Sequence, residues 1–310
     1  MSNAIDLQNL EKNFALSLRL GRRRALDGLS LSVQPGEIYG FLGPNGAGKT
    51  TSIKILVSLL RQDSGVATVF GEDPTRRETR RLIGYLPESP TFYDQLTGRE
   101  FLTFCGKLCG LRGRDLRARS DRLLEQVGLA HAAELQIRRY SKGMNQRVGI
   151  AQALLHDPQL VILDEPMSGL DPIGRAEVRD LILALKKRGK TVFFSTHIIP
   201  DVEMICDRIG LINHGRMVAE GSVSQLLDSS EARPIEVIVE NVTGALDGSL
   251  ASEVSSTGGQ RLYLVNSDEA LARFVSEVLQ RRGRLVSVTP RREGLENLVV
   301  RLLEQDRAAA

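Results

Sequence analysis

The chain has 310 residues, of which 42% are apolar and 25% are charged, and its formal net charge is +3. This composition excludes a disordered tail, and the small net charge gives no general argument for binding nucleic acid. At roughly 150 residues per domain, the length fits two domains.

The sequence shows neither a targeting segment nor a disulfide framework. The first residues, MSNAIDLQNLEKNF, have no basic-then-apolar signal pattern, and no apolar run approaches the roughly 18 to 20 residues of a membrane span. Cys105, Cys109 and Cys206 have no framework spacing, and without a nearby histidine the first two do not form a zinc site. We therefore expect a soluble, reduced cytosolic chain, so that any role at a membrane needs a partner.

The first 60 residues predict a β-rich start and then a helix. The alternating segments AIDLQNL (4–10) and ALDGLSLSV (25–33) predict strands, and IYGFLG (38–43) predicts a buried strand. TTSIKILVSLL (50–60) has helical spacing. Glycines between these last two segments cost backbone entropy, so they indicate a backbone that must approach something closely.

The middle of the chain alternates between strands and helices. Residues from about 92 to 155 are mostly helical and rich in charge, and they predict a separate helical lobe. QLVILDEP (159–166) and KTVFFSTH (190–197) predict strands buried on both faces, and a helix between them ends at Gly189. This alternation predicts an α/β domain with a largely parallel sheet.

After about Leu227 the character of the sequence changes. A polar linker, DSSEARP (228–234), precedes three predicted strands (234–242, 260–266 and 284–290) and two predicted helices (267–283 and 292–305). Asn266 followed by Glu269 fits the N-terminus of the first of these helices. We predict one larger domain over residues 1–227 and a small α/β, ferredoxin-like accessory domain over 228–310, in which no chemical motif is found.

The glycine-rich stretch carries the P-loop pattern Gly43-x-x-x-x-Gly48-Lys49-Thr50. In such a loop, backbone N–H groups and the N-terminus of the following helix bind phosphate oxygens. Lys49 would reach the β- and γ-phosphates, and the Thr50 hydroxyl would bind Mg²⁺. The alternative is a glycine-rich turn without a ligand.

Polar residues end the two later buried strands. Asp164 could support Mg²⁺ through its water shell, and Glu165 could polarise an attacking water; the alternative is a pair that caps a helix. His197 ends the next strand, and ligands of open α/β sheets collect beyond the carboxyl ends of strands. His197 could therefore bind the γ-phosphate, although a surface or core histidine is the alternative.

From about residue 5 to 225, the order of segments resembles the nucleotide-binding subunit of ATP-binding cassette (ABC) transporters. GPNGAGKTT resembles the Walker A loop and VILDEP resembles Walker B. YSKGMNQRVGIAQALL resembles the cassette signature, SGLD (168–171) the D-loop, STH the switch histidine, and IGYLPES the Q-loop. The resemblance implies a P-loop NTPase cassette, with a β-rich subdomain and a helical lobe, that binds ATP with Mg²⁺ and hydrolyses it.

The resemblance also implies the residues of the site. In this family two cassettes pair head to tail, so this chain would need a second copy or a paralogous cassette. Glu165 would be the base and His197 would orient the water. Thr50, Glu88 and Asp164 would face the metal. The nucleotide would contact Phe14, Gly43, Pro44, Asn45, Gly46, Ala47, Gly48, Lys49, Thr50 and Thr51 of one chain and Ser141, Gly143 and Asp171 of the other.

Some positions depart from the family pattern. Lys142 and Met144 stand where the signature usually has a glycine and a glutamine, and Glu88 replaces the usual Q-loop glutamine. Lys142 would either add positive charge near the partner's phosphate or be solvated. Phe14 is the nearest equivalent of the adenine-stacking aromatic, and an ordinary strand residue is the alternative.

The motif SKGMNQR, Glu88 and the small C-terminal unit resemble exporter-type cassettes with separate six-span permeases, and IGYLPESPTFYDQLTGREFL resembles copper-related or nitrous-oxide-reductase maturation cassettes. The resemblance implies a cassette at the cytoplasmic face of the cell membrane. A permease helix would contact Glu88–Tyr93, where Phe92 and Tyr93 suit a docking groove, unless both are core residues.

Two other functions and one basic segment stay open. A non-transport cassette acting on ribosomes or nucleic acid, and a module that binds ATP without turnover, are the competing functions; we expect no nucleic-acid partner. The arginine-rich segment LRGRDLRARSDR (111–122) would be a solvated helix face or a contact with anionic lipid.

Overall fold

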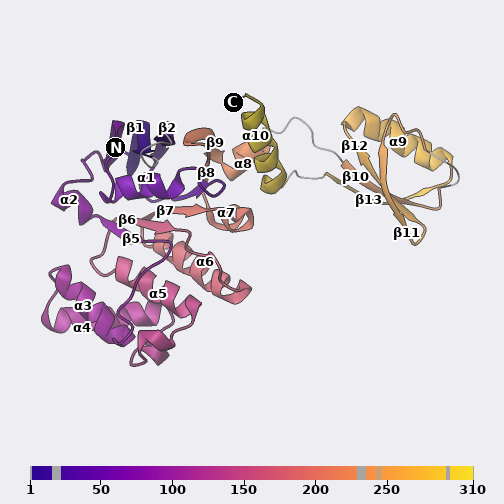
Figure 1. Ribbon diagram of the computed structural model, residues 1–310. Helices are drawn as coiled ribbons and strands as arrows, with labels where there is room; N and C mark the ends of the chain where they lie inside the picture. The colour runs from indigo at the N-terminus through magenta and orange to yellow at the C-terminus, as the bar shows by residue number, and fades with distance from the viewer. Residues whose placement is uncertain are drawn as a thin grey trace. The chain divides into compact units, whose positions relative to one another are not determined.

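The computed structural model describes residues 2–15, 22–228, 235–242, 244, 246–290 and 294–309 (Figure 1). Two compact units form the chain: Met1–Val223 together with Leu302–Ala310, and Ser224–Arg301. Most of the predicted linker, residues 229–234, lies outside the described residues. The functional division at residue 227 stays a prediction, and each unit is described below by itself.

An antiparallel sheet begins the first unit, in the strand order β2–β1–β4. The bounds are β1 Ile5–Ala15, β2 Arg22–Val33 and β4 Ser64–Val69. Alternating apolar residues such as Leu7, Leu29 and Leu31 are buried on one face of this sheet. The predicted β-rich start is confirmed.

The central sheet has the order β5–β6–β7–β3–β8–β9 and is parallel except for the last pair. The bounds are β3 Ile38–Leu42, β5 Ile83–Leu86, β6 Leu160–Asp164, β7 Thr191–Thr196, β8 Arg208–Asn213 and β9 Arg216–Ser222. Every residue of β3, β6 and β7 is buried. Because carboxyl ends of parallel strands share one edge of a sheet, the segments after β3, β6 and β7 lie next to one another.

Helices connect these strands, and three of them form the predicted lobe. In the core the bounds are α1 Lys49–Leu56, α2 Arg77–Arg80, α6 Pro172–Lys187 and α7 Ile199–Ile205. The lobe, seen at the lower left of Figure 1, contains α3 Gly98–Leu108, α4 Gly113–Gln126 and α5 Lys142–Ala153, with 3-10 turns at Ala130–Ala132 and Ile137–Arg139. A capping box of Thr97 and Glu100 fixes the start of α3.

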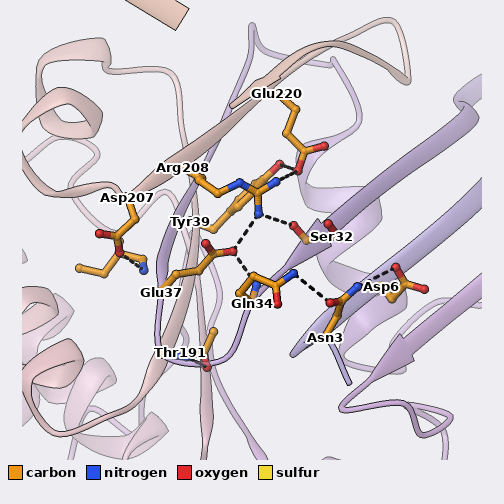
Figure 2. A network of polar contacts seen from close by, with 12 residues as sticks. Asn3, Asp6, Ser32, Gln34, Glu37, Tyr39, Thr191, Asp207, Arg208 and Glu220 are labelled. Carbon is orange, nitrogen blue, oxygen red and sulfur yellow. Dashed lines mark hydrogen bonds and ion pairs between the residues drawn. The ribbon is translucent and has the colours of Figure 1, made fainter. Parts of the chain in front are cut away.

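A polar network joins the β-rich sheet to the amino ends of β3 and β8 (Figure 2). The Arg208 guanidinium donates to Glu37 (3.2 Å), to Glu220 (2.8 Å) and to the backbone oxygen of Ser32 (3.1 Å). The Tyr39 hydroxyl also donates to Glu220, at 3.0 Å. Burial raises the pKa of Glu37, and Arg208 offsets part of that rise. One guanidinium thus crosslinks two sheets at the edge opposite to the carboxyl ends of the parallel strands.

The second unit contains a four-stranded antiparallel sheet in the order β11–β12–β10–β13, which is a ferredoxin-like strand order. The bounds are β10 Ile235–Glu240, β11 Ser252–Thr257, β12 Gln260–Val265, α9 Asp268–Gln280 and β13 Arg284–Pro290. The sequence prediction lacked β11. It was also wrong by one residue at α9, where the Ser267 hydroxyl accepts from Ala270 N and is the N-cap.

Two further helices span the positions in the sequence at which one unit ends and the other begins. These are α8 Val223–Asp228 and α10 Leu295–Ala309. The last residues of α10 belong to the first unit, where Asn213 Nδ2 donates to Asp306 Oδ2 at 2.7 Å. Among the described residues, no helix combines the length and the apolar composition needed to cross a membrane.

Candidate functional site

A cavity of about 470 Å³ lies at the carboxyl ends of the central strands. Most of its lining was predicted from the sequence: Phe14, Asn45, Gly46, Gly48, Lys49, Thr50, Thr51, Glu88 and Glu165. Arg23 and Ala25 of β2 also line it, and sequence reasoning missed both. Neither residue belongs to a recognisable local motif. Both reach the cavity because β2 pairs with β1, and that pairing cannot be seen in the local sequence.

The P-loop backbone is tightly packed, and its glycines are required by geometry. Gly48 has a φ of 116°, and a Cβ there would lie 2.8 Å from the Ala25 backbone oxygen. A Cβ at Gly43 would collide with the Ile212 backbone oxygen. Gly48 is also the N-cap of α1, and the first turn of this described helix has no side-chain cap and no acidic residue. Its N–H groups therefore suit an external anion such as phosphate.

Lys49 places a buried ammonium group inside the loop. Its Nζ donates to the backbone oxygen of Gly43 (2.7 Å) and to that of Pro44 (3.3 Å). It also lies 3.2 Å from Glu165 Oε1, and the two side chains are each only 6% exposed. A buried cation among inward-facing peptide groups is suited to phosphate oxygens.

Asp164 and Thr50 form a pair of oxygen donors beside the loop. Thr50 Oγ1 lies 3.4 Å from Asp164 Oδ1, and the Ser195 hydroxyl donates to the same oxygen at 2.6 Å. Burial raises the pKa of Asp164, and these two hydroxyl hydrogen bonds offset part of the rise. No three His, Cys, Asp or Glu side chains converge in the described part of the chain. A hard cation here would therefore complete its coordination with phosphate and water oxygens, as Mg²⁺ does at phosphate sites.

Glu165 is oriented by contacts on both carboxylate oxygens. Oε1 faces Lys49, and Oε2 lies 2.8 Å from His197 Nδ1. Its backbone has a positive φ of 49°, which is uncommon for a non-glycine residue, and its N–H donates to Ser195 Oγ at 2.9 Å. Ser195 therefore orders both Asp164 and Glu165 from the neighbouring strand, a function that the sequence prediction did not assign.

The remaining predicted positions differ in their relation to the cavity: Phe14 and Glu88 line it, whereas Gly43, Pro44 and Ala47 do not. Ala47 is buried and its backbone oxygen accepts from Gly215 N at 2.8 Å. Phe14 is 40% exposed and lines the cavity, which leaves its stacking role a prediction. Glu88 is exposed at the cavity wall. The predicted contacts of these residues with a nucleotide stay predictions.

The three nucleotide residues that the resemblance assigns to the other chain do not line this cavity. Ser141 is the N-cap of α5, and its hydroxyl accepts from Met144 N at 3.2 Å. Gly143 lies in the first turn of α5, and Asp171 is the N-cap of α6. These groups therefore lie outside the lining of the cavity in the same chain.

Lys142 has a neighbour that the sequence did not indicate. A Cβ built on Gly169 would collide with the Lys142 ammonium and lie 3.2 Å from its Cε atom. The lysine side chain thus packs along the 168–171 segment of the same chain. Lys142 is nevertheless exposed, as the solvated alternative expects, and only its contact with Gly169 is additional.

The two aromatic residues of the predicted docking groove differ from each other. Tyr93 is 56% exposed and packs edge-on against Phe104, with ring centroids 5.2 Å apart. Phe92 packs edge-on against the buried Phe101 at 5.3 Å. Tyr93 is therefore the surface residue of the pair, and Phe92 is partly a core residue.

Comparisons with known proteins agree with this arrangement. Residues 26–168 match the family described as ABC transporter. A Synechocystis ABC transporter ATP-binding protein, sll0415, is 39% identical over 98% of this chain and 86% of its own length. The Nod factor export ATP-binding protein I of Burkholderia lata is 35% identical over 96% of each chain.

A solved structure adds a similarity in three dimensions. The ATP-binding cassette MJ0796, in a dimeric post-hydrolysis state with ADP and Pi, is 25% identical and has a TM-score of 0.65. The alignment covers 71% of this chain and 98% of that one.

Proposed function

Because this chain belongs to the ATP-binding proteins of ABC transporters, and so binds and hydrolyses ATP to drive transport, we propose that two copies pair head to tail around two nucleotides. The observation that carries the proposal is the separation of the two half-sites. The P-loop and Glu165 line one cavity, whereas Ser141 does not line it. The dimeric MJ0796 cassette supports such pairing.

Within each site the residues would divide the work between phosphate, metal and water. Lys49 and the α1 N-terminus would hold the β- and γ-phosphates. Thr50 would bind Mg²⁺ directly, with Asp164 and Glu88 acting through water. The ion would neutralise charge that develops on the phosphates. From the second chain, Ser141 and the backbone at Gly143 would contact the γ-phosphate, and Asp171 would couple the sites.

Glu165 would accept the proton of the attacking water. Its carboxylate is already oriented by Lys49 on one oxygen and by His197 on the other. Phosphate binding gives Lys49 a second anionic partner, which leaves Glu165 Oε1 more available to water. His197 would then fix the position of the base and of the γ-phosphate.

The cassette would work with a separate membrane permease at the cytoplasmic face of the cell membrane. The exposed Tyr93, close to Glu88 in sequence, supports docking of a short permease helix there. The similarity to a Nod factor export protein supports export as the direction of transport. The resemblance to copper-related and nitrous-oxide-reductase maturation cassettes stays part of this proposal.

Glu165→Gln tests the proposed base. We expect ATP turnover to fall about 100-fold or more, because a positioned general base contributes about 10² to 10⁴ in rate. ATP affinity should be retained, since Lys49 and the P-loop backbone are unchanged. Steady-state ATPase rates and nucleotide titration measure the two effects.

Glu125→Gln is the matched control, because Glu125 is an exposed residue of α4 outside the cavity. It should leave both rate and affinity unchanged. Turnover that survives in Glu165→Gln would remove the assignment of the base without affecting the family membership.

A further inference from the structure

A second cavity, of about 260 Å³, lies between the helical lobe and the α/β core. Side chains of α4, of the turn after α5 and of the end of α6 line it. Because Lys190 directly precedes β7, this cavity lies at the amino ends of the parallel strands. The nucleotide cavity lies at their carboxyl ends, so the two sites are separate.

Positive charge dominates the second cavity. Arg119, Arg122, Arg188 and Lys190 line it together with Asp157, the single carboxylate that the described part of the chain contributes. Such like-charged side chains repel one another, and their potential attracts anions.

The single carboxylate cannot balance this charge. Asp157 Oδ1 lies 2.7 Å from Lys190 Nζ and 3.8 Å from Arg119 Nη2, so it is shared between two cations. Arg188 donates to the neutral amide oxygen of Gln126 at 2.8 Å. Arg122 has no hydrogen-bond or ion-pair partner within the described residues. The guanidinium groups of Arg122 and Arg188 therefore have no carboxylate partner among the described residues.

Helix dipoles explain only part of this cluster. Arg188 and Lys190 follow the last turn of α6, where positive charge is favourable. Arg119 and Arg122 come before the last turn of α4, and that described turn contains no basic residue. The ion pair with Asp157 accounts for Arg119, so Arg122 is the residue whose place at the cavity neither a helix dipole nor an ion pair explains within the described residues.

The floor of the cavity is apolar. Leu123, Leu154 and Leu185 line it, and each is no more than 8% exposed. A cationic rim above an apolar floor matches an anion that carries an organic group better than it matches a fully hydrated inorganic ion. Arginine in particular binds phosphate oxygens with two parallel N–H groups.

We propose that this cavity binds the phosphate group of an organic phosphate ester. Arg122 and Arg188 bind the phosphate, and the three leucines contact the organic part. The ester would join α4 of the lobe to the end of α6 in the core. It would thereby stabilise the position that the lobe has here relative to the core. Such an ester can be free in solution or be the headgroup of an anionic lipid.

Calorimetric titration with phenyl phosphate tests the site. The full chain carries Lys49→Ala, so that the P-loop contributes little phosphate binding. We expect phenyl phosphate to bind, inorganic phosphate to bind more weakly, and Arg122→Gln to weaken phenyl phosphate about tenfold, the effect of losing one charged hydrogen-bonding group. Arg122 has no partner to lose among the residues that the structure describes, so this variant should fold normally.

Arg117→Gln is the matched control, since Arg117 is an exposed arginine of the same helix outside the cavity. It should leave the affinity unchanged. If Lys49→Ala lowers the folded fraction, the same titration on the unmodified chain saturated with Mg-ADP replaces it. Binding that both arginine variants weaken equally, or no binding of phenyl phosphate and of anionic vesicles, would overturn the proposal.

Vesicle sedimentation distinguishes the two sources of the ester. Vesicles of phosphatidylcholine with phosphatidylglycerol should retain the chain if the ester is a lipid headgroup, and Arg122→Gln alone should release it. If phenyl phosphate binding depends on Arg122 but no vesicle binding occurs, a free ester is the ligand. Vesicle binding that Arg117→Gln weakens as much as Arg122→Gln would indicate diffuse surface charge and count against the site.

Discussion

At the scale of single residues, the main addition of the structure is Ser195. Its hydroxyl donates to Asp164 and accepts from Glu165 N, so one buried oxygen orders both acidic residues at the end of β6. The sequence segment STH drew attention to the histidine because histidine chemistry is recognisable in isolation. The serine function depends on the pairing of β6 with β7 and could not be predicted from the segment alone.

Ser195→Ala should therefore affect both stability and turnover. The Glu165 N–H would lose its buried partner, at a cost of about 1 to 3 kcal/mol in free energy of unfolding. Loss of an orienting hydrogen bond should also lower ATP turnover about tenfold or more. Denaturant unfolding and ATPase assays on the purified chain measure the two effects.

Thr191→Ala provides the comparison for Ser195→Ala. Thr191 is buried at the start of the same strand and accepts from Gly36 N at 2.9 Å. Its removal should cost a similar free energy of unfolding and leave turnover per folded molecule unchanged. Equal losses of turnover in both variants would indicate that Ser195 acts only through stability.

At the scale of elements, Arg208 shows how the β-rich sheet is joined to the central sheet (Figure 2). Arg208→Met keeps the aliphatic stem but leaves the half-buried Glu37 and Glu220 carboxylates without their cation. We expect a loss of about 2 kcal/mol in the free energy of unfolding at neutral pH. ATP affinity should not change, because the network lies at the opposite ends of the strands.

The penalty of Arg208→Met should depend on pH. Burial already raises the pKa of Glu37, and removal of Arg208 raises it further. A raised native pKa means that the native state holds a proton the unfolded state has released, so stability falls as pH rises. The difference between variant and wild type should shrink on acidification through the Glu37 pKa.

Arg216→Met controls for loss of an arginine in the same β8–β9 hairpin. The Arg216 side chain is 66% exposed and pairs with Asp27. It should cost at most about 1 kcal/mol, because exposed ion pairs contribute little. Penalties of equal size, or an Arg208→Met penalty that is constant with pH, would contradict the crosslinking function of Arg208.

Elements also differ in how far local sequence could predict them. The strands β3, β6 and β7 were predicted because their apolar runs reflect burial on both faces. Strand β11, SEVSST, has one large apolar residue and therefore no alternation to detect. The contact of Lys142 with Gly169 could not be predicted from local sequence, because it joins segments 27 residues apart, at 142 and 169.

At the scale of the whole molecule, the proposed head-to-tail pair makes a prediction about Ser141. In chains that carry Glu165→Gln, ATP should produce a dimer, and Ser141→Arg should prevent it by placing a bulky charge at the pairing surface. Monomers should still bind ATP, since Ser141 does not line the nucleotide cavity. Light scattering with and without ATP measures the dimer.

Ser267→Arg is a fair control for Ser141→Arg, because each serine caps a helix through its hydroxyl. Each substitution should cost about 1 kcal/mol from the lost cap. Only Ser141→Arg should prevent the ATP-dependent dimer. Dimers that form in both variants would show that the signature helix is not at the interface.

The path of the chain between the two units has a practical consequence. The chain leaves the first unit after Val223 and joins it again at Leu302, and the Asn213–Asp306 hydrogen bond ties the returning helix to β8. A spin label or fluorophore placed near residue 306 would therefore report the movements of the ATP-binding unit, although it follows the accessory unit in sequence. Probes meant to follow the accessory unit belong on α9 or on its sheet.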